Sequence, residues 1–247
     1  MIFLSTSTNF DGNYWGEAPQ LSSTYGEYDN GPNVFNGYWN FNGTNLPAAL
    51  STYGIYPTVH NGVKLSIGKS GGSGGIYIAN GVTAPQIFEV LLINQSSEPN
   101  PIIGESTGTS SSVGALYPGY YIQDGDAGVI FLDYMDSSAS GEVTSTSGSM
   151  KGGNIYGFVW LSSSSEIGYQ NYAKFISSSN TRETWSSPIY PFVGIFVNSQ
   201  TTGSEAFQWF RTRAYPPNGV MPTATVGSIP GSNQKYEFAI KLTVNGL

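Results

Sequence analysis

Apolar and polar residues alternate along much of this chain, and the pattern is clearest between residues 28 and 46. In that stretch Phe35, Trp39 and Phe41 would point to one side of an extended backbone, while amide and hydroxyl side chains occupy most of the positions between them. A period of two residues is that of a half-buried β-strand. Turn residues bound the stretch at 29–32 and 42–44, so we predict one strand with an aromatic inner face.

Similar short runs recur along the chain, separated by residues that favour turns. We predict a small hairpin at 59–65 and strands at 75–79, 85–94, 115–123, 127–134, 154–162, 166–176, 191–198, 207–215, 223–228 and 236–244. Polar stretches at 46–58, 98–112 and 137–151 read as loops. No window keeps a helical period for three turns, and many short strands with turns between them predict an all-β sandwich or barrel.

The domain organisation expected from this pattern is simple. Residues 1–27 carry turn residues and large rings without a period, which indicates an N-terminal extension packed on the sandwich; a remnant of a preceding domain is the alternative. Residues 28–247 would form one antiparallel β-sandwich domain. Its predicted core holds the large apolar side chains of the strands, namely Phe35, Trp39, Phe41, Phe88, Val90, Leu92, Phe158, Trp160, Phe196 and Trp209.

Composition narrows the class of partner. Charged residues make up 10% of the chain, against ~25% in ordinary soluble domains. The net charge of −7 and the nine Lys and Arg residues exclude a basic surface for nucleic acid. No apolar run reaches the length of a membrane span, so no membrane insertion is expected. With few carboxylates to protonate, we expect weak dependence of stability on pH.

One predicted hairpin combines rings with planar polar groups. Tyr117, Tyr120 and Tyr121 lead directly into Gln123 and Asp124. Sugars are held by flat aromatic faces together with planar amide or carboxylate groups that fix their hydroxyls. We therefore predict these five residues as a ligand-binding set, with ordinary strand packing as the alternative for the tyrosines.

Asp124 and Asp126 in the same hairpin are the candidate metal ligands. They lie two residues apart across a glycine, and carboxylate oxygens suit calcium. A plain hairpin turn is the alternative reading of the same residues. The chain has one histidine and no cysteine, which leaves little for zinc or copper, so the expectation is no cofactor, with calcium as the exception.

Glu89 is the candidate catalytic residue if the protein is a hydrolase. It lies in an apolar strand, where burial would raise its pKa and suit a general acid. Glycoside hydrolysis needs a second carboxylate nearby, and none stands two or four residues from Glu89. Asp133 and Asp136, three residues apart, would point to opposite faces of their strand.

Several stretches resemble the concanavalin A-like lectin and glucanase domains. Phe41-Asn42-Gly43-Thr44-Asn45-Leu46 is similar to their first strand and turn, which often read Phe-x-Gly-Thr-x-Leu, and 59–66 and 75–93 are similar to the strands that follow. The segment 209–222, with 28–31, resembles a subgroup in surface and virus-associated proteins of thermophilic archaea. The resemblance spans roughly 20–228 and implies a jelly-roll sandwich of two antiparallel sheets. Hydrolases of this superfamily carry a Glu-x-Asp-x-x-Glu cluster on one strand, where this chain has Glu89 alone.

These observations leave three classes of function open. The first is a non-catalytic recognition or adhesion module, extracellular or on a cell or virion surface, whose partner is a glycan or a glycosylated surface protein. The second is a structural subunit of a virion or cell-surface assembly, which would form a homo-oligomer. The third is a glycoside hydrolase that uses Glu89.

Overall fold

The computed structural model describes residues 35–68, 71–83, 85–95, 100–112, 115–125, 128–137, 139–197 and 202–216, with the backbone of 223–227 and 239–243. The chain divides into two units. Residues 36–214 form one unit, and residues 1–35 with 215–247 form the other. The predicted extension, residues 1–27, lies outside the described residues. In the second unit β16 (Thr223–Gly227) pairs with β17 (Ala239–Thr243) as a separate two-stranded sheet.

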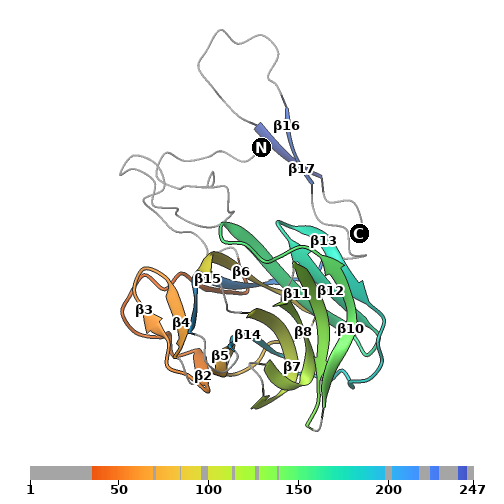
Figure 1. The fold of residues 1–247 in the computed structure, drawn as a ribbon. Helices are drawn as coiled ribbons and strands as arrows, with labels where there is room; N and C mark the ends of the chain where they lie inside the picture. Colours follow the sequence, from red (N-terminus) through yellow and green to blue (C-terminus); the bar gives the residue numbers. More distant parts are fainter. Residues whose placement is uncertain are drawn as a thin grey trace. The chain divides into compact units, whose positions relative to one another are not determined.

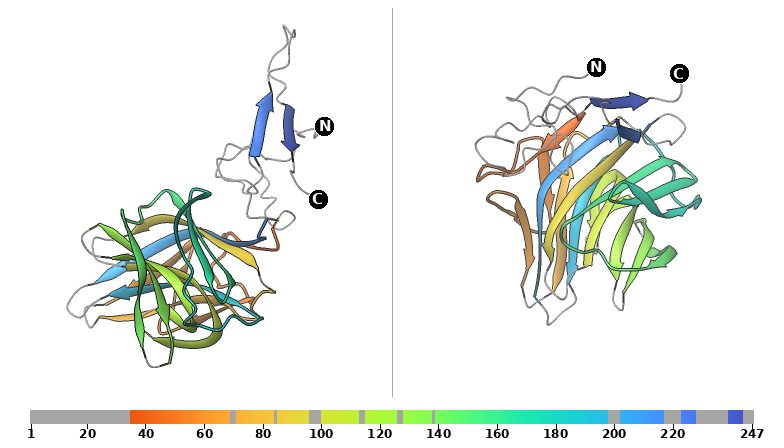
Figure 2. Two further views of the ribbon diagram at one scale, coloured as in Figure 1. Left: turned by 90° about the vertical axis from the view of Figure 1, so that its right-hand side faces the viewer. Right: turned by 90° about the horizontal axis from the view of Figure 1, so that it is seen from above.

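The larger unit contains two sheets, which Figures 1 and 2 show packed face to face. Sheet A has the order β13-β12-β11-β6-β15-β4-β3, and β1 pairs with the far end of β15. Its strands are β1 (Gly37–Trp39), β3 (Thr58–Val59), β4 (Val63–Ile67), β6 (Gln86–Gln95), β11 (Asn154–Ser162), β12 (Ser165–Gln170), β13 (Ala173–Ser178) and β15 (Gly203–Ala214).

Sheet B has the order β10-β9-β8-β7-β14-β5-β2. Its strands are β2 (Leu50–Tyr53), β5 (Gly72–Ile78), β7 (Asn100–Ser112), β8 (Ala115–Gly125), β9 (Val129–Met135), β10 (Ser140–Ser147) and β14 (Tyr190–Val197). All registered strand pairs are antiparallel, and spatial neighbours such as β6 and β15 are far apart in the chain. The predicted fold class, an all-β antiparallel jelly-roll sandwich, is confirmed. Within the described ranges the structure has no helix that is long and apolar enough to cross a membrane.

The hydrophobic core lies between the two sheets, where alternate residues of facing strands meet. Of the predicted core residues, seven are buried: Phe41, Phe88, Val90, Leu92, Phe158, Trp160 and Trp209. Phe35, Trp39 and Phe196 are only partly buried. Phe41 has a φ of 53°, so the backbone leaves the extended conformation there, and the predicted strand shortens to β1.

Three segments predicted as loops are strands. β7 is paired on both sides within sheet B, and β2 and β10 form its two edges. Much of β7 and β10 is Ser, Thr and Gly, which gives no hydrophobic alternation to recognise. The predicted strand at 166–176 is instead a hairpin of β12 and β13, because Asn171 and Tyr172 turn the chain with φ values of 48° and 69°.

Candidate functional site

A pocket of about 340 Å³ lies on the outer face of sheet B, the face turned away from sheet A. Three strands, β8, β9 and β10, supply most of its lining, and β14 adds one ring. The lining consists of aromatic rings, polar groups and two carboxylates: Tyr121, Gln123, Phe131, Asp133, Ser140, Gly141, Glu142 and Phe196. The volume is at the lower end of the ~300–1,000 Å³ found for small-molecule sites.

The strand register brings the two carboxylates together. Asp133 of β9 lies directly opposite Glu142 of β10, and on its other side it lies opposite Tyr121 of β8. Directly opposed residues of antiparallel strands have Cβ atoms ~4.5–5.5 Å apart. Burial, and then the negative charge of Glu142, raise the pKa of the Asp133 carboxyl from 3.8 to about 7. Near neutral pH the pair therefore offers both a hydrogen-bond donor and hydrogen-bond acceptors.

Aromatic rings on this face of the sheet lie close to the backbone of neighbouring strands, because glycines stand next to them. A Cβ atom added at Gly104 would lie 2.8 Å from Cζ of Phe192, its cross-strand partner. A Cβ atom at Gly75 would collide with the Tyr53 ring, and one at Gly125 would collide with the Phe131 ring. Each ring thus covers a neighbouring strand that has no side chain in the way.

The aromatic surface continues beyond the pocket toward the other edge of the sheet. The ring centroids of Tyr53 and Tyr77 are 6.3 Å apart, and those of Tyr77 and Tyr190 are 6.5 Å apart. All three tyrosines are partly exposed. Pocket and aromatic surface together span the outer face of sheet B from β10 to β2.

Strand alternation divides the ligand-binding set predicted from the sequence. Tyr121 and Gln123 face outward and line the pocket, although the Tyr121 side chain is only 3% exposed. Tyr117 packs on the same side, against the apolar cluster that contains Tyr121. Tyr120 and Asp124 point the other way, into the sandwich. The structure therefore brings Tyr121 and Gln123 together and separates them from Tyr120 and Asp124.

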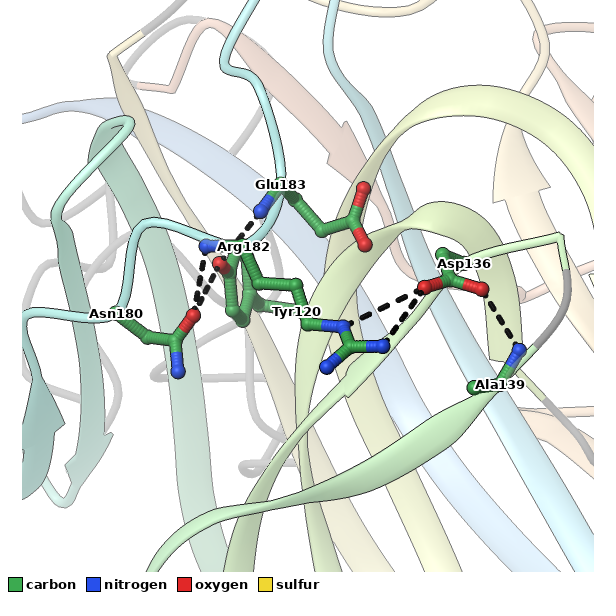
Figure 3. Close-up of polar contacts among 6 residues, drawn as sticks. All are labelled: Tyr120, Asp136, Ala139, Asn180, Arg182 and Glu183. Atoms are coloured by element: carbon green, nitrogen blue, oxygen red, sulfur yellow. Dashed lines mark hydrogen bonds and ion pairs between the residues drawn. The ribbon is translucent and has the colours of Figure 1, made fainter.

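Tyr120 connects the interior of sheet B to the segment that follows β13 (Figure 3). Its hydroxyl donates to Oδ1 of Asn180 at 3.1 Å and accepts from the backbone N–H of Glu183 at 2.9 Å. In the same segment Arg182 reaches Oδ2 of Asp136 at 3.4 Å, and its guanidinium lies 4.1 Å from the centre of the Tyr134 ring. Since Tyr120 is fully buried, a substitution there reports on the fold.

The residues predicted to hold calcium are only partly described. Asp126 lies outside the described residues. Asp124 is 5% exposed, and its Oδ2 accepts the backbone N–H of Met150 at 3.0 Å. Across the residues with described side chains, no group of three or more His, Cys, Asp or Glu residues is placed to hold a metal ion.

Glu89 lies on the outer face of sheet A rather than in the pocket. Its carboxylate accepts from Nε of Arg211 at 2.8 Å and from Nη2 of Arg213 at 2.7 Å. Burial by itself would raise the pKa of Glu89, but the two guanidiniums outweigh it and bring the pKa below its ordinary value. The expected raised pKa is therefore wrong, because the sequence did not show that Arg211 and Arg213 pair with this residue across the strands.

The carboxylate pair and two of the rings in the pocket were missed from the sequence. The sequence places Asp133 only with acids of its own strand, whereas its partner Glu142 lies on β10, a segment predicted as a loop. Phe196 was assigned to the core, and Phe131 was not selected as a ligand-binding residue. The signal in the sequence is that Asp133 stands three residues before, and Glu142 three residues after, the Ser-rich segment 136–139.

Comparison with known sequences gives one relative and no family. No family model matches the chain. "Uncharacterized protein 562" of Sulfolobus islandicus rod-shaped virus 1 is 27% identical over 262 residues, which cover 91% of this chain and 44% of that protein. The chain thus spans less than half the length of this viral relative.

Comparison with solved structures shows the fold. The carbohydrate recognition domain of Emp46p superposes with a TM-score of 0.51 at 9% identity, covering 67% of this chain and 88% of that one. The endo-β-1,3-glucanase of Pyrococcus furiosus gives a TM-score of 0.53 at 9% identity, covering 72% and 93%. The chain therefore has the concanavalin A-like jelly-roll fold that these lectin and glucanase domains share.

Proposed function

We propose that the protein is a glycan-recognition module whose binding surface is the outer face of sheet B. The observation that carries this proposal is the pocket itself, which is lined by the rings of Tyr121, Phe131 and Phe196 together with Gln123 and two carboxylates. Aromatic faces pack against the apolar side of a sugar ring, and planar polar groups fix its hydroxyls. The partly exposed rings of Tyr53, Tyr77 and Tyr190 extend the surface for a longer chain.

The comparisons support this choice of ligand. Emp46p contributes a carbohydrate recognition domain with the same fold, and the Pyrococcus furiosus protein is an endo-β-1,3-glucanase. The viral relative supports a place for the module on the exterior of a virion or on a cell surface. The low content of charged residues leaves hydroxyl and amide groups to cover most of such a surface.

Recognition without hydrolysis is favoured by the state of Glu89. A general acid must carry a proton that it can give to the leaving oxygen. Glu89 is held as a carboxylate by Arg211 and Arg213, on the other sheet from the pocket. The carboxylates that do lie in the pocket are Asp133 and Glu142, so reducing ends released by the wild type but not by a variant of this pair would assign hydrolysis to them.

A glycan array with matched glutamine variants tests the proposal. Gln123 lines the pocket, whereas Gln170 is a partly exposed glutamine on β12 of sheet A. Gln123→Ala should weaken binding to the glycans retained by the wild type by about fivefold, the equivalent of ~1 kcal/mol for one hydrogen bond. Gln170→Ala should leave binding unchanged. A folded wild-type protein that retains no glycan, with or without calcium, would refute the proposal and favour a structural subunit.

A further inference from the structure

The outer face of sheet B has an uneven distribution of charge. Asp133 and Glu142 are opposed across β9 and β10, and both line the pocket. None of the described residues that line the pocket is Lys, Arg or His. Arg182 does not line the pocket, and its guanidinium pairs with Asp136. Among the described residues, the lining of the pocket thus contains two acidic side chains and no basic one.

An anionic ligand group would meet two costs in this pocket. It would be brought close to the carboxylates, and like charges placed side by side are unfavourable, the more so away from bulk water. It would also lose its hydration shell, and no Lys, Arg or His side chain among the described lining residues would pair with it in return. Burial has already made the pocket unfavourable for the negative charge of Asp133, whose pKa is raised to about 7.

A neutral sugar meets neither cost. Its hydroxyls donate hydrogen bonds to carboxylate oxygens, which are strong acceptors, and the Gln123 amide can both donate and accept. The rings of Phe131 and Phe196 pack against its C–H groups without regard to charge. The same residues that repel a sulfate or a carboxylate therefore hold a hydroxyl.

We propose that the Asp133–Glu142 pair makes this pocket selective for neutral glycans and excludes glycans that carry sulfate or carboxylate groups. The inference rests on the proposed function, because it names the chemical class of ligand for that same site. It assigns Asp133 and Glu142 as the residues that determine specificity.

The test is an array on which glucan, galactan and mannan oligosaccharides are each printed in neutral and sulfated form. The wild type should retain neutral forms about tenfold more tightly than their sulfated counterparts at low salt, a difference that shrinks as salt screens the charges. The double variant Asp133→Asn/Glu142→Gln keeps the shape and the hydrogen-bonding groups and removes both charges. It should keep neutral forms within about threefold and lose most of the discrimination against sulfated forms.

Asp136→Asn is the matched control. It also removes a negative charge, at the residue directly after β9, but Asp136 does not line the pocket. Its discrimination should equal that of the wild type. Thermal unfolding of each variant shows that it is folded.

The outcomes separate this inference from the function on which it rests. A wild type that retains neutral and sulfated forms equally, or a double variant that still discriminates, overturns the selectivity while glycan binding stands. A wild type that retains no glycan of either kind overturns the proposed function itself, and the selectivity with it.

Discussion

Asp133→Asn should stabilise the protein at neutral pH and leave its stability in acid unchanged. The folded protein keeps the Asp133 proton up to about pH 7, whereas the unfolded chain releases it near pH 3.8. The stability that this group contributes is therefore fully present below pH 3.8 and is lost as the pH rises to about 7. Asparagine does not titrate, so the variant does not undergo this loss.

The structure sets the size of the effect. A pKa raised from 3.8 to about 7 corresponds to ~4 kcal/mol at 1.36 kcal/mol per unit. Because the Asp133 side chain is only partly buried, water screens part of this free energy. We therefore expect the free energy of unfolding of Asp133→Asn to exceed that of the wild type by ~2 kcal/mol at pH 8. Asp133 faces Glu142 on β10 and Tyr121 on β8, so Glu142→Gln should move the midpoint of the wild-type loss to lower pH.

Denaturant unfolding from pH 3 to pH 8 measures this directly. The free energies of unfolding of wild type and Asp133→Asn should coincide near pH 3 and diverge between pH 4 and pH 7. Two curves that stay parallel over the whole range would show that Asp133 titrates normally and would refute the reasoning. Stability should also fall with rising pH through the titration of four further carboxyl groups whose pKa values are raised by burial, namely Glu105, Glu166, Glu183 and Glu205. The protein should thus gain stability toward acid, rather than respond weakly to pH as composition alone suggests.

Three further predictions concern the parts that hold the site in place. Glu89→Ala should cost about 3–5 kcal/mol in denaturant unfolding, because buried Arg211 loses its carboxylate; a cost below ~1 kcal/mol would contradict the buried ion pair. Tyr120→Phe should cost about 1–3 kcal/mol, because the buried N–H of Glu183 loses its acceptor, and an unchanged midpoint would show that another acceptor replaces it. Added calcium should leave the melting temperature unchanged, since the described Asp124 carboxylate already accepts from Met150 and no group of three described His, Cys, Asp or Glu residues is placed to hold a metal ion; a rise that chelation reverses would assign a calcium site.

The sequence predicted the architecture better than it predicted the site. Strands with large apolar residues, such as β6 and β11, were recognisable, because their side chains fill the space between the sheets. β10 could not be recognised, since an edge strand of Ser, Thr and Gly has no hydrophobic alternation. Glu142 was missed with it, and the pairing of Glu142 with Asp133 depends on a register that only the fold supplies.

The alternation of side chains along β8 could have sorted the predicted ligand-binding residues onto the two faces of the sheet. Tyr120 and Asp124 lie on one face of β8, and Tyr121 and Gln123 lie on the other. Which of the two faces points into the core depends on what packs against β8. Tyr120 meets the Trp160 ring of sheet A, with centroids 5.1 Å apart, and this contact joins residues that are distant in the chain.

The central claim is that the outer face of sheet B binds glycan, and titration calorimetry with two phenylalanine variants tests it most directly. Phe196 lines the pocket, and Phe175 is another partly buried phenylalanine, on β13 of sheet A. The ligand is the neutral oligosaccharide that the wild type retains best on the array. Phe196→Ala should raise the dissociation constant by about tenfold, the equivalent of ~1.4 kcal/mol for a lost ring contact, while Phe175→Ala leaves it unchanged. An unchanged dissociation constant for Phe196→Ala, with the loss appearing in Phe175→Ala, would contradict the claim.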